Sequence, residues 1–354
     1  MRAKKIFLLS SSYLCSLSLL RMPFSLLMTG VPQADVPVAH AQGPALQGMF
    51  LQLIREVDPA VNQRLHDDSR YRPYTLSPLG IEPTPAPSQE GKSTLHHSQE
   101  GKSTLHHSQE GKSTLHHSQE GRKGGRATTR IPLPGGGRGG FDGFRWPREH
   151  LLRRGTPCFV RITLLEDALF PTFSRYFLAR PEPTFRLGET DFTVTNVQVT
   201  PERGNPWCAF ATYAELIARA AQQAGRRITL RFLTPTSFRN GDVDMALPLP
   251  RLVFLGYLKR FQEFHPFPFP ADAAQQIDRY IGVTRIPALR TDTIRAKGVA
   301  IPGFVGEIQF ELDPQAPPEF RMAIHLLADF AYFSGTGRKT TVGMGQTMRM
   351  RNEE

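Results

Sequence analysis

A glycine-rich segment near the C-terminus constrains the fold of this chain more than any other feature. Residues 334–346 read Ser-Gly-Thr-Gly-Arg-Lys-Thr-Thr-Val-Gly-Met-Gly-Gln. Apolar residues from Phe320 to Ala331 recur at helical spacing, and Gly335 stands where a glycine commonly ends a helix. From Val342 to Met350 the residue types alternate, which predicts a strand. The pattern therefore predicts a buried helix, a loop and a strand, in that order.

The loop has the chemistry of a phosphate contact. Glycines let backbone N–H groups approach a phosphate closely, and two adjacent cations add positive charge. A Walker A nucleotide site is not indicated, because that loop joins a strand to a helix and needs a Gly-Lys step that Arg338 interrupts. We expect the loop to lie along a nucleic-acid backbone, with no nucleotide cofactor. One face of the predicted strand carries no side chain at Gly343 and Gly345, which leaves room for a polyanion against the sheet. The candidate RNA-binding residues are Gly335, Gly337, Arg338, Lys339, Gly343 and Gly345.

The charge balance agrees with a polyanionic partner. The 354 residues include 43 Lys and Arg against 32 Asp and Glu, a formal net charge of +11. An excess of this kind favours polyanions. The cysteines, Cys15, Cys158 and Cys208, show no CxxC spacing, which argues against a zinc ribbon or a disulfide framework and suits the cytoplasm. We expect no metal site, no cofactor and no membrane partner.

Two segments interrupt the folded pattern. Residues 1–21 hold cations followed by an apolar run, the outline of a secretory signal, with Ala39-His40-Ala41 as a candidate cleavage motif. Cleavage there would remove the strand expected over 23–30, so we favour Met22 as the start and interpret 1–21 as a spurious extension, with export as the alternative. Residues 81–140 hold perfect copies of Ser-Gln-Glu-Gly-Lys-Ser-Thr-Leu-His-His and a Gly/Arg-rich run, which predicts a disordered insertion because so few apolar residues cannot build a core.

Several stretches resemble a known family. They are Pro302–Gly306 (PGFVG), residues 228–238 (ITLRFLTPTSF), residues 46–78 near the N-terminus, and the C-terminal helix and loop. These resemble the CRISPR-associated endoribonuclease that processes precursor CRISPR RNA, in the repeat-associated mysterious protein (RAMP) superfamily.

The resemblance implies an α+β fold of two tandem ferredoxin-like (RAMP/RRM-like) domains, each β-α-β-β-α-β. They would occupy residues 22–203, which include the insertion, and residues 204–354. The implied partner is CRISPR precursor RNA, and other CRISPR effector subunits remain open as partners.

The same resemblance selects the candidate catalytic residues. RNA is cut without a metal when a base takes the 2′-hydroxyl proton and an acid protonates the leaving 5′-oxygen, and histidine suits either role. In the family a histidine in the context of His66, within Leu-His-Asp-Asp, is catalytic, and a cation six positions later assists it; Arg72 holds that position. Arginine keeps its proton, so Arg72 would stabilise charge on the phosphate. His40 lies before the first helix, where other members have their active histidine, and is the second candidate.

Two functions of different classes follow. The first is a metal-independent endoribonuclease that cuts CRISPR repeat RNA and leaves a 2′,3′-cyclic phosphate. The alternative is a non-catalytic RNA-binding subunit with the same fold. Some family members have a catalytic tyrosine on the first helix; its absence here, near Phe50 and Leu51, favours the alternative. The PTSF and RPYTLSP segments favour the enzyme.

The domain assignment predicts that neither interrupting segment is needed for folding. A chain that begins at Met22, with residues 84–138 replaced by a short Gly/Ser linker, should be soluble and bind repeat RNA like the full chain, because neither segment contributes an element to the two domains. Circular dichroism and an RNA-binding titration would check this. An insoluble product, or a native N-terminus that maps to Gln42, would contradict the assignment.

Overall fold

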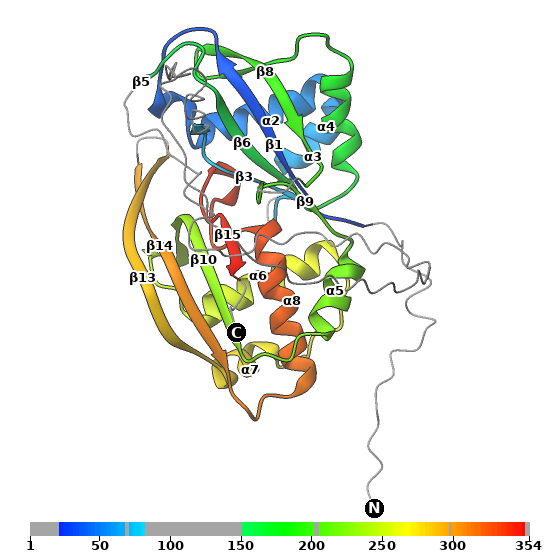
Figure 1. The fold of residues 1–354 in the computed structure, drawn as a ribbon, viewed down its shortest axis with the longest axis vertical. Coiled ribbons are helices and arrows are strands. Elements are labelled where there is room, and N and C mark those ends of the chain that lie inside the picture. The colour runs from blue at the N-terminus through cyan, green and yellow to red at the C-terminus, as the bar shows by residue number, and fades with distance from the viewer. Residues whose placement is uncertain (1–20, 68–70, 82–150, 202–204, 297–298, 351–354) are drawn as a thin grey trace, which may run out of the picture. The chain divides into compact units, whose positions relative to one another are not determined.

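The chain folds into two ferredoxin-like domains in tandem, each an antiparallel sheet with helices packed against it (Figure 1). The computed structural model describes residues 21–67, 71–81, 151–201, 205–296 and 299–350. Apart from Arg21 and Ile81, the expected extension and the expected insertion lie outside the described residues.

The first domain contains the elements β1 (Phe24–Pro32), α2 (Pro44–Val57), α3 (Pro59–Asp67), β3 (Tyr74–Leu76), β6 (Cys158–Leu164), α4 (Leu169–Leu178), β7 (Thr184–Leu187) and β8 (Thr190–Gln198). Shorter pieces are β2 (Val36–Pro37), the 3-10 helix η1 (Val38–Ala41), β4 (Gly80–Ile81), β5 (Leu151–Leu152) and β9 (Ala209–Phe210). The sheet order is β3-β6-β1-β8-β7. It is the β-α-β-β-α-β arrangement with β7 added at one edge.

The second domain repeats this strand order. Its elements are β10 (Arg227–Thr236), α6 (Pro250–Phe264), β13 (Ile281–Ala296), β14 (Val299–Leu312), α8 (Pro318–Ser334) and β15 (Thr347–Met350). The sheet order is β13-β14-β10-β15, which matches β3-β6-β1-β8 of the first domain. The remaining elements are α5 (Tyr213–Ala221), α7 (Ala273–Tyr280), the 3-10 helix η2 (Thr340–Val342) and the hairpin of β11 (Phe238–Asn240) and β12 (Val243–Met245).

Hydrophobic periodicity explains why these segments form these elements. In α2 the apolar residues at helical spacing are the buried ones: Leu46, Met49, Phe50, Leu53 and Ile54. In β10 the residues alternate between buried and half-buried, as a strand with one covered face requires.

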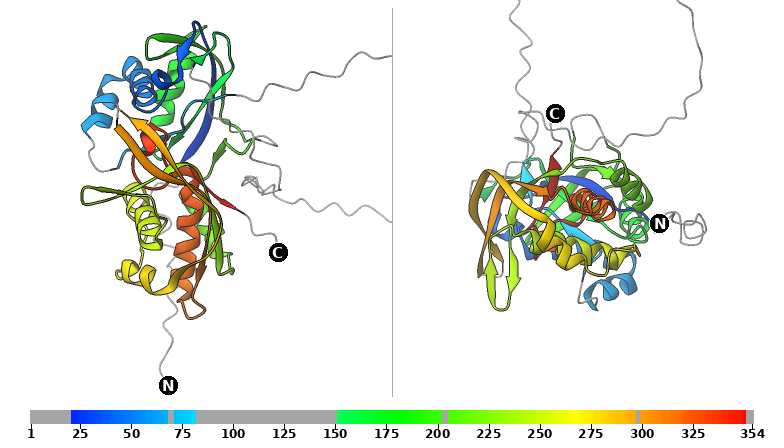
Figure 2. Two further views of the ribbon diagram at one scale, coloured as in Figure 1. Left: turned by 90° about the vertical axis from the view of Figure 1, so that its left-hand side faces the viewer. Right: turned by 90° about the horizontal axis from the view of Figure 1, so that it is seen from below.

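Two parts of the second domain differ from the sequence-based expectation. The strand predicted from Val342 begins only at Thr347, because Gly343 (φ 100°) and Gly345 (φ 70°) adopt left-handed backbone conformations that do not fit the extended geometry of a regular strand. The long strand β13 was not predicted at all. It pairs along its length with β14 (Figure 2), so backbone hydrogen bonds stabilise it. Its sequence, which includes charged residues and Pro287, shows no clear alternation of apolar and polar residues, and for this reason the strand could not be recognised from the sequence.

A buried arginine in the middle of β6 joins the two domains. Arg161 is only 2% exposed. Its Nη1 donates to Gln346 Oε1 (2.6 Å), and its Nη2 donates to Tyr332 O (2.7 Å) in α8. Its Nε donates to Ser25 Oγ (2.7 Å) in β1. The guanidinium also lies 4.1 Å from the centroid of the Tyr332 ring. None of these partners is a carboxylate, so neutral oxygens and an aromatic face solvate the charge inside the protein.

Removing this guanidinium should destabilise the whole molecule. We expect Arg161→Met to lower the free energy of unfolding by about 3 kcal/mol or more, because several buried acceptors lose a charged donor at once. Urea denaturation would measure it. Arg175→Ala is the matched control, since Arg175 is an exposed cation on α4, and surface changes of this kind stay within about 0.5 kcal/mol. Equal effects of the two changes would contradict the role assigned to Arg161.

Candidate functional site

The glycine-rich loop is held by its own backbone against β10 and the residues that follow it. Thr336 N donates to Gly345 O (2.8 Å), and Gly345 N donates to Pro235 O (3.1 Å). Arg338 N donates to Ser237 O (2.9 Å). These three amides bind protein carbonyls, so side chains rather than these amides would have to contact a ligand.

Close packing accounts for two of the loop glycines. A Cβ on Gly345 would overlap Thr336 O, and a Cβ on Gly343 would lie 2.9 Å from Pro78 Cγ. Both residues are buried. The open face expected beside these glycines is therefore filled by protein atoms, and that part of the sequence-based expectation is wrong. Gly335, also buried, ends α8 as expected.

The two loop cations differ in their surroundings. Arg338 Nη1 forms an ion pair with Asp244 Oδ1 in β12, and Arg239 Nη1 contacts the same oxygen at 3.2 Å. Partial desolvation acts to raise the pKa of Asp244, but hydrogen bonds from the two arginines hold it below its ordinary value. Among the described residues, Lys339 is the single non-glycine residue with a positive φ (55°). Such a conformation is costly for a residue with a Cβ and commonly marks a functional position.

Arg72 contacts the end of α3, the helix that holds His66. Arg72 is half-buried, and its Nη1 donates to the backbone carbonyl of Leu65, the residue before His66. The His66 side chain is exposed on the last turn of α3. The arginine is therefore held at the backbone of the residue before His66, while the His66 side chain is exposed.

A polar chain connects this pair to the glycine-rich loop. Gln47 Nε2, in the first turn of α2, donates to Tyr74 Oη (3.2 Å) and to Thr341 Oγ1 (3.3 Å). Burial raises the pKa of the Tyr74 phenol, while the Gln47 hydrogen bond and the nearby Arg72 charge act to lower it. The sequence analysis missed Gln47, Tyr74 and Thr341. A tyrosine two residues after the candidate cation was the available signal, but the partners on α2 and on the loop emerge only in the fold.

The other histidines lie apart from this pair. His40 is exposed at the end of η1, where a Cβ on Gly188, in the β7–β8 turn, would lie 3.1 Å from its carbonyl oxygen. Within the described residues no hydrogen bond joins His40 to Arg72 or His66. His325 is buried in α8, with Nε2 2.7 Å from Gly225 O, and burial lowers its pKa to about 4. It is a neutral core residue.

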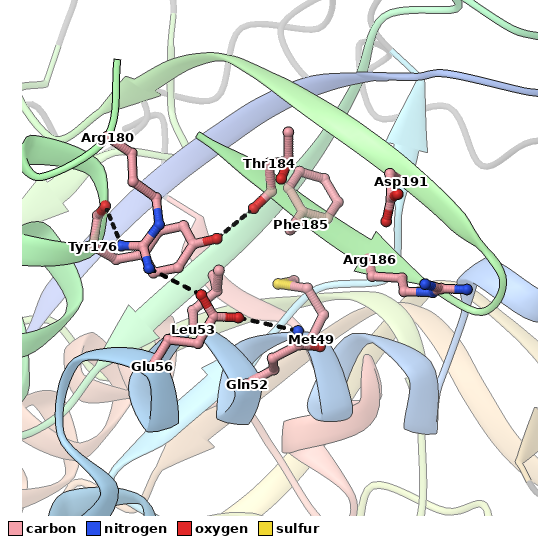
Figure 3. A pocket seen from close by; sticks show the side chains of 10 residues that line it. All are labelled: Met49, Gln52, Leu53, Glu56, Tyr176, Arg180, Thr184, Phe185, Arg186 and Asp191. Atoms are coloured by element: carbon pink, nitrogen blue, oxygen red, sulfur yellow. Dashed lines mark hydrogen bonds and ion pairs between the residues drawn. The ribbon is translucent and has the colours of Figure 1, made fainter. Parts of the chain in front are cut away.

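A cavity on the first domain is lined by charged and polar side chains that pair with one another (Figure 3). It lies between α2, α4 and the edge strand β7 and has a volume of about 260 Å³. Arg180 pairs with Glu56 at 3.0 Å and stacks 3.9 Å from the centroid of the Tyr176 ring. Tyr176 Oη donates to Thr184 O (2.7 Å). Because these polar groups are paired, the cavity is a poor candidate for an anion site.

In the described part of the chain, no three His, Cys, Asp or Glu side chains gather in a way that would hold a metal ion. In the same residues, no helix combines the length and the hydropathy needed to cross a bilayer.

Two tandem ferredoxin-like domains, with a glycine-rich loop after the last helix, define a RAMP-type protein. Comparison with known families is consistent with this class: residues 22–122 and 136–218 match the CRISPR Cas6 N-terminal domain, and residues 230–347 match the family described as CRISPR-associated endoribonuclease Cas6. The chain belongs to the Cas6 family.

Individual relatives are distant. A CRISPR-associated endoribonuclease Cas6 from Streptococcus thermophilus is 27% identical over 117 residues, 32% of this chain and 46% of that protein. The Mycobacterium tuberculosis protein of the same name is 31% identical over 127 residues, 35% of this chain and 39% of that protein. The chain thus spans less than half the length of these curated relatives.

Solved structures share the fold. A Cas6 product complex has a TM-score of 0.63 and 24% identity, and the match covers 94% of this chain and 100% of that one. A Thermus thermophilus Cas6 has a TM-score of 0.57 and 23% identity, with 93% and 98% covered.

The loop cations should contribute to RNA binding through their charge. We expect Arg338→Ala combined with Lys339→Ala to weaken binding of repeat RNA regardless of sequence, and to flatten the salt dependence by up to about 2 units. Fluorescence anisotropy at several salt concentrations would measure both.

Asp244→Asn is the matched control. It removes the carboxylate that faces Arg338, so it should leave binding unchanged or strengthen it. Unaltered affinity and salt slope in the double variant would remove these cations from the RNA-binding surface.

Proposed function

We propose that this protein is an endoribonuclease that cuts CRISPR repeat RNA without a metal ion and produces guide RNAs. Membership of the Cas6 family supports the reaction class. The single observation that carries the proposal is the hydrogen bond from Arg72 to the carbonyl of Leu65, which places the arginine at the end of the helix that holds His66. The proposed substrate is precursor CRISPR RNA, and the proposed compartment is the cytoplasm.

The proposed reaction is an internal transesterification. A base removes the proton from the 2′-hydroxyl, the 2′-oxygen forms a bond to the adjacent phosphorus, and the bond to the 5′-oxygen breaks. The leaving 5′-oxygen takes a proton, and the other product keeps a 2′,3′-cyclic phosphate. His66 is assigned to proton transfer because its imidazole is exposed and an imidazole can both accept and donate a proton.

Arg72 is assigned to the phosphate. Its guanidinium stays charged, so it stabilises the negative charge that builds on the non-bridging oxygens. Its donation to Leu65 O fixes its position before the substrate arrives, which lowers the reorganisation needed during the reaction. Tyr74 is assigned to positioning, since its buried ring packs at a tilt against Phe50, with ring centroids 4.3 Å apart, and its hydroxyl is hydrogen-bonded to Gln47.

His40 is the alternative proton-transfer group. It precedes the first turn of α2, the helix that also holds Gln47, and its side chain is exposed. A substrate that follows the N-terminal end of α2 would meet His40, whereas one that follows the end of α3 would meet His66. The two assignments therefore differ in the path of the RNA.

The catalytic assignment predicts a separation of rate from binding. His66→Ala should abolish cleavage and leave RNA affinity near wild type, because a proton-transfer group contributes about 10²–10⁴-fold to rate and little to ground-state binding. Arg72→Ala should lower both, and His40→Ala should have the smaller effect on rate. Single-turnover cleavage and anisotropy titrations would measure them, with Gln63→Ala, an exposed neighbour on α3, as the control. Cleavage should persist in EDTA.

Several outcomes would contradict the proposal. Activity that is lost in EDTA and restored by Mg²⁺ would replace the mechanism with a metal-assisted one. A larger rate effect of His40→Ala than of His66→Ala would exchange their roles. Tight RNA binding without any cleavage by the wild-type chain would favour the non-catalytic RNA-binding subunit.

A further inference from the structure

A second cavity lies beside α6, next to the glycine-rich loop. Its volume is about 260 Å³. We call it the α6 pocket; Leu252, Leu255, Gly256 and Lys259 line it from α6, and Gly337 and Arg338 line it from the loop. Tyr71, the residue before Arg72, belongs to the same lining. One lining residue of the pocket is therefore the direct sequence neighbour of Arg72, the candidate phosphate-binding arginine.

One part of the α6 pocket is apolar and aromatic. Tyr71, Phe238, Leu252 and Leu255 contribute to the wall. Tyr71 is half-buried, and the Arg260 guanidinium lies 5.8 Å from the centroid of its ring. An aromatic ring backed by a guanidinium is a surface on which a nucleobase stacks well.

The other part is strongly basic. Five cations line the pocket: Arg239, Arg251, Lys259, Arg260 and Arg338. Carboxylates pair with three of them, because Asp244 contacts Arg239 and Arg338, and Asp278 contacts Arg251.

Two cations on α6 have no such partner. In the described part of the chain no carboxylate pairs with Lys259 or Arg260. Arg260 Nη1 donates to the carbonyl of Ser334, which orients the guanidinium, while its Nε is covered by protein atoms without an acceptor. Burial lowers the pKa of Arg260 to about 10, so it keeps its charge at neutral pH. A partly buried, uncompensated cation is costly unless an anion approaches it.

We propose that the α6 pocket holds one unstacked nucleotide of the RNA substrate, with its base against Tyr71 and its phosphate near Lys259 and Arg260. The inference rests on the proposed function, since it assumes an RNA ligand. Single-stranded RNA is commonly bound by splaying a base onto an aromatic side chain while cations hold the backbone. The volume lies below the roughly 300–1,000 Å³ of sites for drug-sized ligands, which suits a single nucleotide. The aromatic wall distinguishes the pocket from a simple phosphate site.

Gly256 offers a way to block the pocket without disturbing the fold. Nothing lies within 4 Å of a Cβ built at this position, and leucine has a higher helix propensity than glycine. Gly256→Leu should therefore fold normally and fill the space that the base would occupy. Ala218→Leu is the matched control, because it enlarges an exposed position on α5. Lys259→Ala tests the phosphate contact separately.

The experiment uses the full chain and repeat RNA from its own locus, with 2-aminopurine substituted singly at each position of the RNA in turn, paired or unpaired. We expect fluorescence quenching on binding at one position, because a stacked base is quenched. Gly256→Leu should remove that quenching and weaken RNA binding about 5- to 100-fold, the contribution of one stacked base. Lys259→Ala should lower the salt slope by about 1 unit. Ala218→Leu should leave the quenching, the RNA affinity and the salt slope unchanged.

The outcomes separate this inference from the proposed function. If the wild-type chain cuts the RNA, and Gly256→Leu binds it with unchanged affinity and unchanged quenching, the pocket does not hold a nucleotide and the cleavage function stands. If the wild-type chain binds no repeat RNA, both ideas are overturned. If Gly256→Leu and Ala218→Leu weaken binding equally, the effect is general and the pocket inference is again contradicted.

Discussion

The two domains depend on one buried guanidinium. Arg161 lies in β6 of the first domain, yet it donates to Gln346 and to the carbonyl of Tyr332 in the second domain. Gln346 in turn donates through Nε2 to Leu76 O in β3 (3.0 Å). Hydrogen bonds to a buried charge are strong and directional, so this network fixes the end of the glycine-rich loop against the strand that follows Arg72.

The glycine-rich loop is held in place by packing and by hydrogen bonds on both of its sides. Gly345 lies so close to Thr336 that any side chain would displace the loop, and Thr336 Oγ1 is itself 2.5 Å from the buried Tyr257 hydroxyl. The loop is thereby attached to α6 on one side and, through Thr341 and Gln47, to α2 on the other. Rigid attachment on both sides presents the cations of the loop at a fixed position, which favours recognition of a polyanion with little loss of conformational entropy.

The candidate catalytic pair and the α6 pocket are linked by two consecutive residues. Tyr71 lines the pocket, and Arg72 reaches the end of α3 beside His66. A nucleotide stacked on Tyr71 would therefore be tied to the position of the phosphate that Arg72 contacts. Holding a substrate in a reactive geometry contributes strongly to the rate of an intramolecular attack, so binding in the pocket and cleavage would act together in such an arrangement.

The sequence by itself indicated individual elements, because hydrophobic periodicity and the glycine and proline positions are local signals that α2, α8 and β10 show clearly. Its resemblance to a known family implied the fold class and selected His66 and Arg72 as candidate catalytic residues. Only the tertiary structure decided what surrounds them. Gln47, Tyr74 and Thr341 come from three separate parts of the chain. Lys259 and Arg260 differ from the neighbouring arginines of the pocket because, among the described residues, carboxylates pair with those arginines and not with these two. Contacts between residues far apart in sequence leave no periodic pattern, and the long pairing of β13 with β14 is set by backbone hydrogen bonds that any sequence can make.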